Sequence, residues 1–445
     1  MDTSTAFDDR YEIRRFAPGL DAGGAADAAT SAFWDSMGRG FHETMAPARM
    51  LRTVPHLVAD GLEQLGVYRR DPFPGSIDET EPIGTFGSLR KELSWGDGTG
   101  IDTFAVIGVT VRPTERRRGV LRRMMTDSLR RAAAEGYAVA SLTASEGSIY
   151  RRFGFGPGIR ERTIDIRAER AVPFLTPTTG EVAVVDTATL ADGVARQVFD
   201  RFHARTPGSM VRNSGVWGRL LGREDDAGAV DPAVRGAAHR PSRSEPIDGY
   251  VTYRIVDAET PAQRLDVVDL VAATDEAYLA LWEYLLSVDL NDVVRYPLAR
   301  IDDPIVAAIR DNRAMSIVRE EDHVWYRVLD VAATLESRPW AVDGTLTIAL
   351  VDNLGFADGV FRLTVREGRG SVERIGDRPA SGADERGPAA DLAMDVAELG
   401  SLLLGAVDPR TLAAAGLVQA AEETAPALLH AMLTPVRTPH GITYF

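Results

Sequence analysis

The residues that suggest chemistry most directly form a basic turn at residues 116–119, between an apolar run and an amphipathic segment. The apolar run, residues 104–111, has the character of a strand. From Leu121 onward apolar residues recur at three- and four-residue intervals, as in a helix. The first turn of a helix favours anions and disfavours cations, because its N–H groups are unpaired and its dipole is positive there. Three arginines at this place therefore predict a diphosphate ligand, which Gly119 allows to approach the backbone closely.

Two further groups stand out along the chain. Ser145, Glu146 and Tyr150 follow a predicted strand at residues 137–142 and lie in a segment rich in glycine and aromatic residues. A tyrosine in such a segment is more often a packing residue than a catalytic one, and the residues alone leave both readings open. The chain ends on Tyr444 and Phe445, which predicts a docked tail, because exposed termini are usually polar.

The elements around these groups have the pattern of an α/β unit. A helix is predicted around residues 25–41, where Phe33, Trp34 and Asp35 are candidates for lining a ligand pocket. A strand pair is predicted on either side of a glycine-rich turn at residues 96–98. Its second strand, residues 101–111, is almost continuously apolar, which suits a central position covered on both faces. The helix that begins at Gly119 is predicted to end at Gly136, a residue type that favours helix C-caps.

The length of 445 residues predicts more than one domain. We expect a first unit at residues 1–170, a second at 171–330 and a third at 331–445, with a proline- and threonine-rich linker at 173–180.

The second unit repeats the strand–turn–helix order of the first. A buried strand is predicted at residues 265–272 and an amphipathic helix at 275–288. The turn between them has neither glycine nor arginine, so this copy is expected not to hold a diphosphate. Residues 223–245 are polar and are predicted to form a surface excursion.

The third unit has a different pattern. Strands at residues 345–351 and 360–365 predict a hairpin or meander. A polar stretch at 366–391 follows, and helices are predicted at 397–407 and 409–415.

Composition excludes several classes of function. The formal net charge of −15 disfavours a nucleic-acid partner, which would need basic surface. The chain has no cysteine, and its seven histidines show no metal-ligand spacing, so no metal is expected. There is no Walker-type Gly-Lys-Ser/Thr element. Without an apolar stretch of membrane-spanning length or a hydrophobic signal region, we expect no membrane partner and a cytoplasmic location.

The basic turn resembles the acyl-CoA pyrophosphate loop of the GNAT superfamily of N-acetyltransferases, Arg/Gln-x-x-Gly-x-Gly/Ala. Arg116 and Gly119 occupy the first two defined positions, and Leu121 departs from the small third residue. The whole chain resembles the Eis (enhanced intracellular survival) family. The resemblance rests on this turn, the segment 144–154, the chain length and the terminal Phe445. That resemblance implies an α/β (α+β) fold. It further implies two GNAT domains in tandem, the first active and the second degenerate, followed by a sterol-carrier-protein-like domain at the end of the chain.

The resemblance also implies roles for individual residues. Val109, Thr110 and Val111 would bind acetyl-CoA through the strand backbone. The pyrophosphate would be held by the turn and the start of the helix, formed by Arg116, Arg117, Arg118, Gly119, Val120, Leu121 and Arg122. Ser145 and Glu146 would contact the acetyl end, Tyr150 would be the general acid, and the C-terminal carboxylate on Phe445 the general base.

The function implied is direct acetyl transfer from acetyl-CoA to a primary amine of an aminoglycoside, a polyamine or a lysine side chain. The family assembles as a homohexamer, so an oligomer is expected here. Two departures affect the acceptor pocket: Gly108 stands where relatives carry a bulky aromatic residue, and Tyr444 where a glutamate is common. Two alternatives remain: a carrier of lipid or another apolar ligand through the third unit, and a non-catalytic protein that binds acetyl-CoA.

Overall fold

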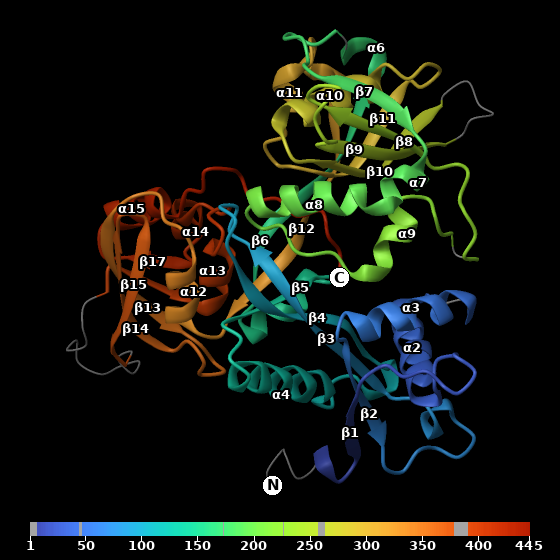
Figure 1. Cartoon of the computed structure of the whole chain (residues 1–445). Coiled ribbons are helices and arrows are strands. Elements are labelled where there is room, and N and C mark those ends of the chain that lie inside the picture. The colour runs from blue at the N-terminus through green and yellow to red at the C-terminus, as the bar shows by residue number, and fades with distance from the viewer. Residues whose placement is uncertain (1–6, 44–46, 172, 226, 257–262, 378–389) are drawn as a thin grey trace.

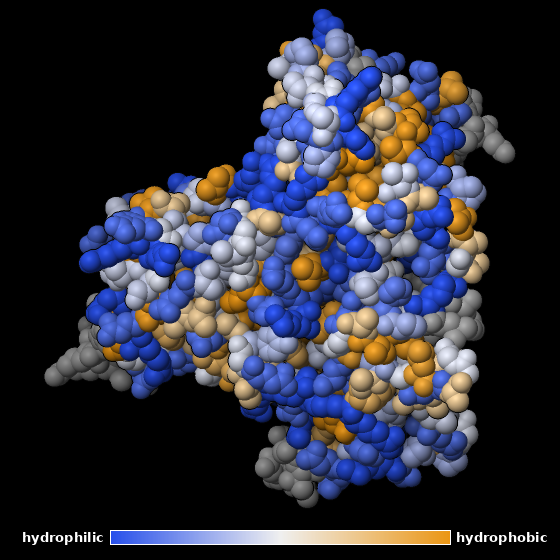
Figure 2. Space-filling view, in the orientation of Figure 1, coloured by the Kyte–Doolittle hydropathy of each residue, from blue (hydrophilic) through white to orange (hydrophobic). Residues whose placement is uncertain are grey.

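The structure, a computed structural model, describes residues 7–43, 47–171, 173–225, 227–256, 263–377 and 390–445. A twelve-stranded sheet runs through the first and second units, and the third unit has a five-stranded sheet. The three units meet at the centre of the molecule, and the C-terminus lies at that centre (Figure 1). Figure 2 shows hydrophilic residues over most of the same face, with hydrophobic residues in separate patches. No helix among the described residues is long and apolar enough to cross a membrane.

The first unit contains, in chain order, β1 (Tyr11–Phe16), α2 (Ala28–Phe41), α3 (Pro47–Ala59), β2 (Glu63–Arg69), η1 (Ile77–Glu79), β3 (Gly84–Ser94), β4 (Gly100–Val111), η2 (Pro113–Glu115), α4 (Val120–Ala134), β5 (Val139–Thr143), α5 (Gly147–Tyr150), η3 (Arg151–Phe153) and β6 (Gly156–Arg167).

The predicted hairpin and helix of the first unit are confirmed. β3 and β4 pair antiparallel around the turn that contains Gly96 and Gly98, both with positive φ. Gly119 is the N-cap of α4 with φ of 82°, and Gly136 follows the helix with φ of 89°. These left-handed conformations cost a glycine little, so the turns lie where the glycines do.

The second unit contains α6 (Ala168–Ala171), β7 (Glu181–Val185), α7 (Thr187–Thr189), η4 (Leu190–Val194), α8 (Ala195–Arg205), η5 (Ser214–Val216), α9 (Trp217–Leu220), β8 (Arg235–Arg240), β9 (Gly249–Val256), β10 (Arg264–Ala272), α10 (Asp275–Leu286), β11 (Val293–Ala299), α11 (Ile305–Ala308), η6 (Asn312–Ala314) and β12 (Met315–Val328).

The predicted strand and helix at β10 and α10 are confirmed, but the surface excursion expected in this unit needs correction. Residues 223–245 are not only a surface excursion, because they include β8, which lies inside the sheet between β7 and β9. Its central residues, Gly236, Ala237 and Ala238, are buried but lack the β-branched and aromatic side chains that signal a strand. The segment 173–180 packs on the second unit through Phe174, which is part of that unit's core.

The two units share their sheet because β12 crosses from the second into the first. It lies between β5 and β6, antiparallel to both. β6 in turn pairs with β11 of the second unit. Main-chain hydrogen bonds therefore join the two units across this junction, and neither unit has a complete sheet without the other.

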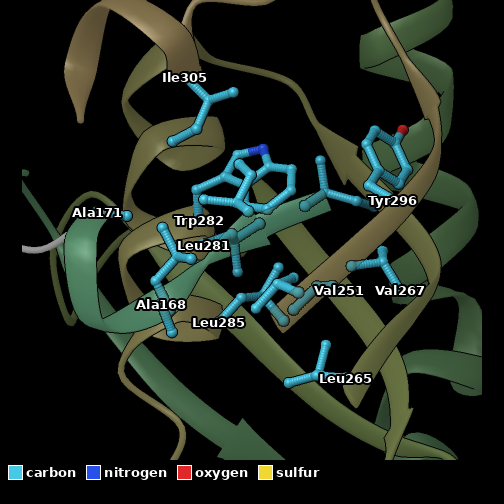
Figure 3. Packing of buried hydrophobic residues seen from close by; sticks show 14 of the residues in the cluster. Ala168, Ala171, Val251, Leu265, Val267, Leu281, Trp282, Leu285, Tyr296 and Ile305 are labelled. Atoms are coloured by element: carbon cyan, nitrogen blue, oxygen red, sulfur yellow. The ribbon is translucent and has the colours of Figure 1, made fainter. Parts of the chain in front are cut away.

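The core of the second unit lies between its sheet and α10. Trp282 of α10 is fully buried and its ring is edge-on to Tyr296 of β11, with centroids 5.9 Å apart. Leu281 and Leu285 flank it and face Val251 and other strand residues (Figure 3). This apolar contact fixes α10 against β10, so the turn between them has a defined position.

The third unit contains α12 (Val331–Ser337), β13 (Gly344–Val351), β14 (Gly359–Arg366), β15 (Arg369–Gly376), β16 (Leu392–Asp395), α13 (Val396–Leu402), α14 (Pro409–Ala414), β17 (Val418–Ala420) and α15 (Thr424–Leu433).

The hairpin of β13 and β14 and the helices α13 and α14 are confirmed. The polar stretch predicted at 366–391 includes a strand, β15, at the edge of the sheet. Charged side chains such as Arg374 are common on edge strands, which explains why the stretch has the pattern of a loop. Residues 378–389 of that stretch lie outside the described residues.

A buried ion pair fastens the third unit to the shared sheet. Arg327 of β12 donates to both carboxylate oxygens of Asp352, at 2.7 Å each, and to the carbonyl of Phe153 at 2.9 Å. Both charged side chains are almost completely buried. Burial alone would raise the pKa of Asp352, but the charge and hydrogen bonds of Arg327 lower it, so the carboxylate stays ionised. Phe153 follows the segment of Tyr150, so this pair also fixes that segment.

We expect Asp352→Asn to lower the free energy of unfolding by about 3–5 kcal/mol, because it leaves the Arg327 charge buried without a counterion. Urea unfolding measures the change. The matched control is Glu373→Gln, which breaks the exposed pair with Arg362 and should cost less than about 1 kcal/mol. Equal stability of the two variants would contradict this account.

Candidate active site

The centre of the candidate site is an opening between two parallel strands. β4 and β5 pair only from Thr103 to Val106, and β4 then continues to Val111 without β5 as a partner. On its other side β4 has a β-bulge against β3 at Gly108 and Val109. A bulge turns the backbone locally and leaves a residue unpaired. The stretch Val109, Thr110 and Val111 is therefore where the sheet can pair with an extended ligand.

Gly108 is required at the bulge. Its φ is 58°, and a Cβ atom there would lie 2.7 Å from the Met37 sulfur. Met37 of α2 thus fills the space next to Gly108, the position at which the resemblance implies a bulky aromatic residue in relatives.

The basic turn follows β4 at the same edge. Arg116, Arg117, Arg118 and Gly119 are exposed. Arg117 has φ of 62°, and the N-cap Gly119 has no side chain to satisfy the first N–H groups of α4. Within the part of the chain that the structure describes, Arg116 and Arg117 form no ion pair, and neither does Arg122 in the first helical turn. The turn therefore presents free positive charge and free N–H groups, as an anion site requires.

Glu115 fixes the base of this turn. Its carboxylate is almost fully buried, accepts hydrogen bonds from Tyr11 and Arg69, and lies 3.5 Å from an Arg118 nitrogen. Of the predicted phosphate-binding arginines, Arg118 is therefore partly neutralised. Val120 is buried and Leu121 half-buried, so these two contribute backbone rather than side chains.

Ser145 and Glu146 lie just beyond the end of β5 and are exposed. Tyr150 lies one short helix further on, with its ring almost buried and edge-on to Phe155. Its hydroxyl has no hydrogen-bond partner among the described residues, and it is not one of the fully enclosed polar atoms. Burial, with a smaller effect of Glu146, raises the pKa of Tyr150 to about 12. The phenol therefore keeps its proton through the neutral range.

The docked tail predicted from the sequence is present. The Thr143 hydroxyl, at the tip of β5, donates to a backbone oxygen of Phe445 at 2.8 Å. The Phe445 ring packs on a cluster that includes Phe33 and Trp34 of α2, whereas Asp35 points to solvent. The last residue of the chain thus lies where β4 and β5 separate.

Tyr150 and Phe445 approach this edge from different sides. Tyr150 belongs to the core between the sheet and α4, and Phe445 to clusters on the α2 side and around Met210. The structure thus brings the strand, the basic turn, Ser145, Glu146 and Phe445 to one edge of the sheet. It keeps the ring of Tyr150 in the core next to them.

Lys91 is a charged residue of the site that sequence analysis missed. It lies on β3 and is 1% exposed. Its Nζ atom donates to the Val211 carbonyl at 2.6 Å and lies 5.6 Å from the centroid of the Phe445 ring. It is the only lysine of the chain. This single lysine could have marked position 91 as unusual from the sequence alone, because every other Lys or Arg position is an arginine.

A buried cluster around the penultimate residue was also missed. Tyr444 stacks on His323, with ring centroids 4.5 Å apart, and donates a hydrogen bond to Glu161. His323 Nε2 donates to the Thr443 carbonyl at 3.1 Å, and its Nδ1 lies 2.7 Å from the Glu161 carboxylate. These residues are far apart in sequence, so no local pattern predicts the cluster. It holds the tail just before Phe445.

Among the described residues no group of three or more His, Asp or Glu side chains is placed to hold a metal ion.

Comparison with protein families matches three segments. Models of the acetyltransferase (GNAT) domain match residues 25–158 and 208–328, and a model of the sterol carrier protein domain matches residues 331–441. The predicted fold class, two GNAT domains followed by a sterol-carrier-protein-like domain, is therefore confirmed.

Whole-length relatives agree. An uncharacterized N-acetyltransferase of Streptomyces avermitilis is 33% identical over 372 residues, which cover 81% of this chain and 85% of the relative. The N-acetyltransferase Eis of Mycobacterium tuberculosis is 32% identical over 368 residues, 78% of this chain and 81% of the relative. The crystal structure of Eis1 from Mycobacterium abscessus superposes with a TM-score of 0.77 at 30% identity, covering 98% of this chain and 100% of that one. The sequence matches cover 78–81% of the chain and the structural match covers 98% of it, and the chain belongs to the Eis family of GNAT N-acetyltransferases.

Proposed function

We propose that this acetyltransferase moves the acetyl group of acetyl-CoA directly to a primary amine, on an aminoglycoside, a polyamine or a lysine side chain. One observation carries the proposal: a backbone oxygen of Phe445 is bound at the tip of β5, where β4 and β5 separate. If the chain ends there, a carboxylate lies at the point where the sheet can hold the thioester.

The residues on the cofactor side fit an acyl-CoA. Arg116, Arg117 and Arg122 are exposed at a helix N-terminus and form no ion pair with the described residues, which suits a diphosphate. The backbone of Val109 and Val111, which β5 does not pair with, suits the amide groups of an extended arm. When bound, acetyl-CoA supplies the acetyl group and a thiolate leaving group. Backbone N–H groups at the bulge would stabilise negative charge on the carbonyl oxygen during transfer.

Two groups of the site are placed to donate or accept protons during the transfer: the Tyr150 phenol and the Phe445 carboxylate. The Tyr150 phenol, with its pKa raised to about 12, is a weaker acid than an ordinary alkyl thiol of pKa about 8.5. It therefore acts as a hydrogen-bond donor that stabilises the departing thiolate, and full proton transfer to sulfur is uphill in its present environment. The Phe445 carboxylate would orient the acceptor ammonium and take its proton, directly or through water.

The carrier alternative has less support. A cluster of buried side chains, including Leu346, Leu363 and Leu429, occupies the space between the sheet and helices of the third unit. The match of this unit to the sterol carrier protein domain concerns its fold, and a fold alone does not imply function.

The proposal is tested by thiol release from acetyl-CoA with a panel of aminoglycosides, polyamines and lysine peptides. We expect turnover with at least one of these amines. Tyr150→Phe, which removes only the hydroxyl, should lower kcat by about 10²-fold or more with little change in the KM for acetyl-CoA, because a hydrogen-bond donor to the developing thiolate is lost. Acetyl-CoA binding without turnover on any amine would refute the amine acceptor, and an unchanged kcat in Tyr150→Phe would remove Tyr150 from the mechanism.

The arginine turn makes a separate prediction. Replacing Arg116 and Arg117 together by alanine should raise the Kd for acetyl-CoA by roughly tenfold, because two charge-assisted contacts to phosphate are lost. At saturating acetyl-CoA, kcat should be unchanged. Isothermal titration measures the Kd. The control is Arg130→Ala, at the exposed far end of α4, which should leave the Kd unchanged. An unchanged Kd in the double variant would place the diphosphate elsewhere.

Lys91 sets the charge next to Phe445. Burial lowers its pKa from 10.5 to about 8, against a small opposing effect of Asp60. At neutral pH the folded protein still holds the proton, and above pH 8 it loses it. An unfolded chain keeps the proton up to about pH 10.5. Between these two values the unfolded state binds more protons, so the contribution of Lys91 to stability rises with pH.

We therefore expect the difference in unfolding free energy between wild type and Lys91→Met to change with pH. It should be constant below pH 7 and should move in favour of wild type by roughly 1 kcal/mol per pH unit between pH 8 and 10. Urea unfolding of both proteins at several pH values measures it, and subtraction removes groups that titrate in both. A difference independent of pH would show that Lys91 has an ordinary pKa.

A further inference from the structure

The second unit repeats the architecture of the cofactor opening. β10 pairs with parallel β11 only from Arg264 to Asp266, and then the two strands separate, as β4 and β5 do. β10 also has a bulge against β9 at Val268, as β4 has against β3. A turn and the helix α10 follow. The second unit thus has a groove equivalent to the one that the Proposed function assigns to acetyl-CoA.

The chain's own C-terminal segment fills this groove. The cavity left between the strands is about 40 Å³ and is lined by Leu270 and Ala272 of β10 and by Arg437 and His440 of the tail. Small-molecule pockets are typically about 300–1,000 Å³, so this remainder is too small for a cofactor. Where the first unit offers a place for an extended ligand, the second holds residues 437–440.

Charge explains why the tail and not a phosphate occupies this place. α10 begins with Asp275, whereas the turn before α4 carries arginines, and Asp275 also pairs with Arg205 of α8 at 2.8 Å. Arg437 lies 3.1 Å from both Asp275 oxygens, and Thr438 donates to Asp302 at 2.5 Å. A carboxylate at this position repels a diphosphate and attracts a cationic chain.

The segment beyond the groove is held continuously as far as the candidate active site. The His440 N–H donates to the Pro207 carbonyl at 2.9 Å, and its imidazole is edge-on to Phe202. Ile442 packs in the core around α8. The Thr443 hydroxyl donates to the Met210 carbonyl at 2.9 Å. Together with the bonds of Tyr444 and Phe445, these contacts leave the tail little freedom along its path, which Figure 1 shows ending at the centre.

We propose that the second unit has kept its cofactor groove as a seat for residues 437–440, and that this seat positions the backbone of Phe445 at the acetyl-transfer site. The role in catalysis rests on the Proposed function, whereas the seat itself does not. Arg437, Thr438, Asp275 and Asp302 are positioning residues, because they contact the tail and not the reacting groups. They act by fixing the start of a segment whose end carries the base.

The test uses the full chain with Arg437→Ala and Thr438→Val combined, which changes only the tail. We expect kcat for the amine to fall by roughly tenfold or more, since small misplacements of reacting groups are costly. The Kd for acetyl-CoA and the thermal unfolding midpoint should stay at the wild-type values. Carboxypeptidase A should release Phe445 and Tyr444 faster than from wild type, because the tail leaves its seat more often.

Two controls match this variant. Val436→Ala changes the neighbouring residue, which is fully exposed, and should leave every readout unchanged. Arg410→Ala removes an exposed arginine that pairs with an aspartate elsewhere in the third unit, and should also have no effect. Arg437→Lys with Thr438→Ser keeps the charge and the hydroxyl, and should restore most of the kcat and of the protease resistance.

The outcomes separate the seat from the catalytic proposal. If the double variant has the wild-type kcat and releases Phe445 at the wild-type rate, residues 437 and 438 do not hold the tail and the proposed seat is wrong. A lower kcat with unchanged release would overturn the positioning role. If wild type shows no turnover with any amine, the Proposed function is wrong. The rates at which carboxypeptidase A releases Phe445 from wild type and variant then test the seat without it. Titration should give one acetyl-CoA per chain, and a second bound molecule would show that the groove is not reserved for the tail.

Discussion

The insertion of β12 between β5 and β6 is the constraint on which the rest of the structure depends. Because this strand carries residues of the second unit into the sheet of the first, the two units are held by main-chain hydrogen bonds rather than by side-chain contacts alone. The same strand supplies His323 to the tail and Arg327 to the third unit. One strand therefore ties the second unit, the third unit and the tail to the sheet that carries the candidate site.

A rigid junction of this kind can hold the C-terminal segment in one place. Termini usually fray, and fixing one costs conformational entropy at each residue. Here the last residues pass through the groove of the second unit, the loop at Pro207 and Met210, and the pair Glu161 and His323. Each contact is individually small, and together these contacts offset the entropy cost of fixing the segment.

Local features of the fold could be predicted from the sequence, and non-local ones could not. The hairpin of β3 and β4, the helix α4 and the pair β10–α10 depend on glycine turns and on apolar periodicity, which are visible in a short window. β8 was missed because its buried residues are small, and β15 because its edge position tolerates charge. The position of β12 depends on strand pairing between residues far apart in sequence. The basic turn could be found because arginine at a helix N-terminus is locally unfavourable, whereas the burial of Lys91 and Tyr444 depends on distant partners.

Position 91 carries a lysine, whereas other buried cations of the chain, such as Arg327 and Arg338, are arginines. Arginine keeps its proton in proteins, so an arginine here would place a permanent charge beside the Phe445 ring. A lysine can lose its proton when desolvated, and the pKa of Lys91, lowered to about 8 by burial, lies near the range in which enzymes work. The charge that Lys91 holds 5.6 Å from the centroid of the Phe445 ring therefore depends on pH. An arginine at this position would keep its charge throughout that range of pH.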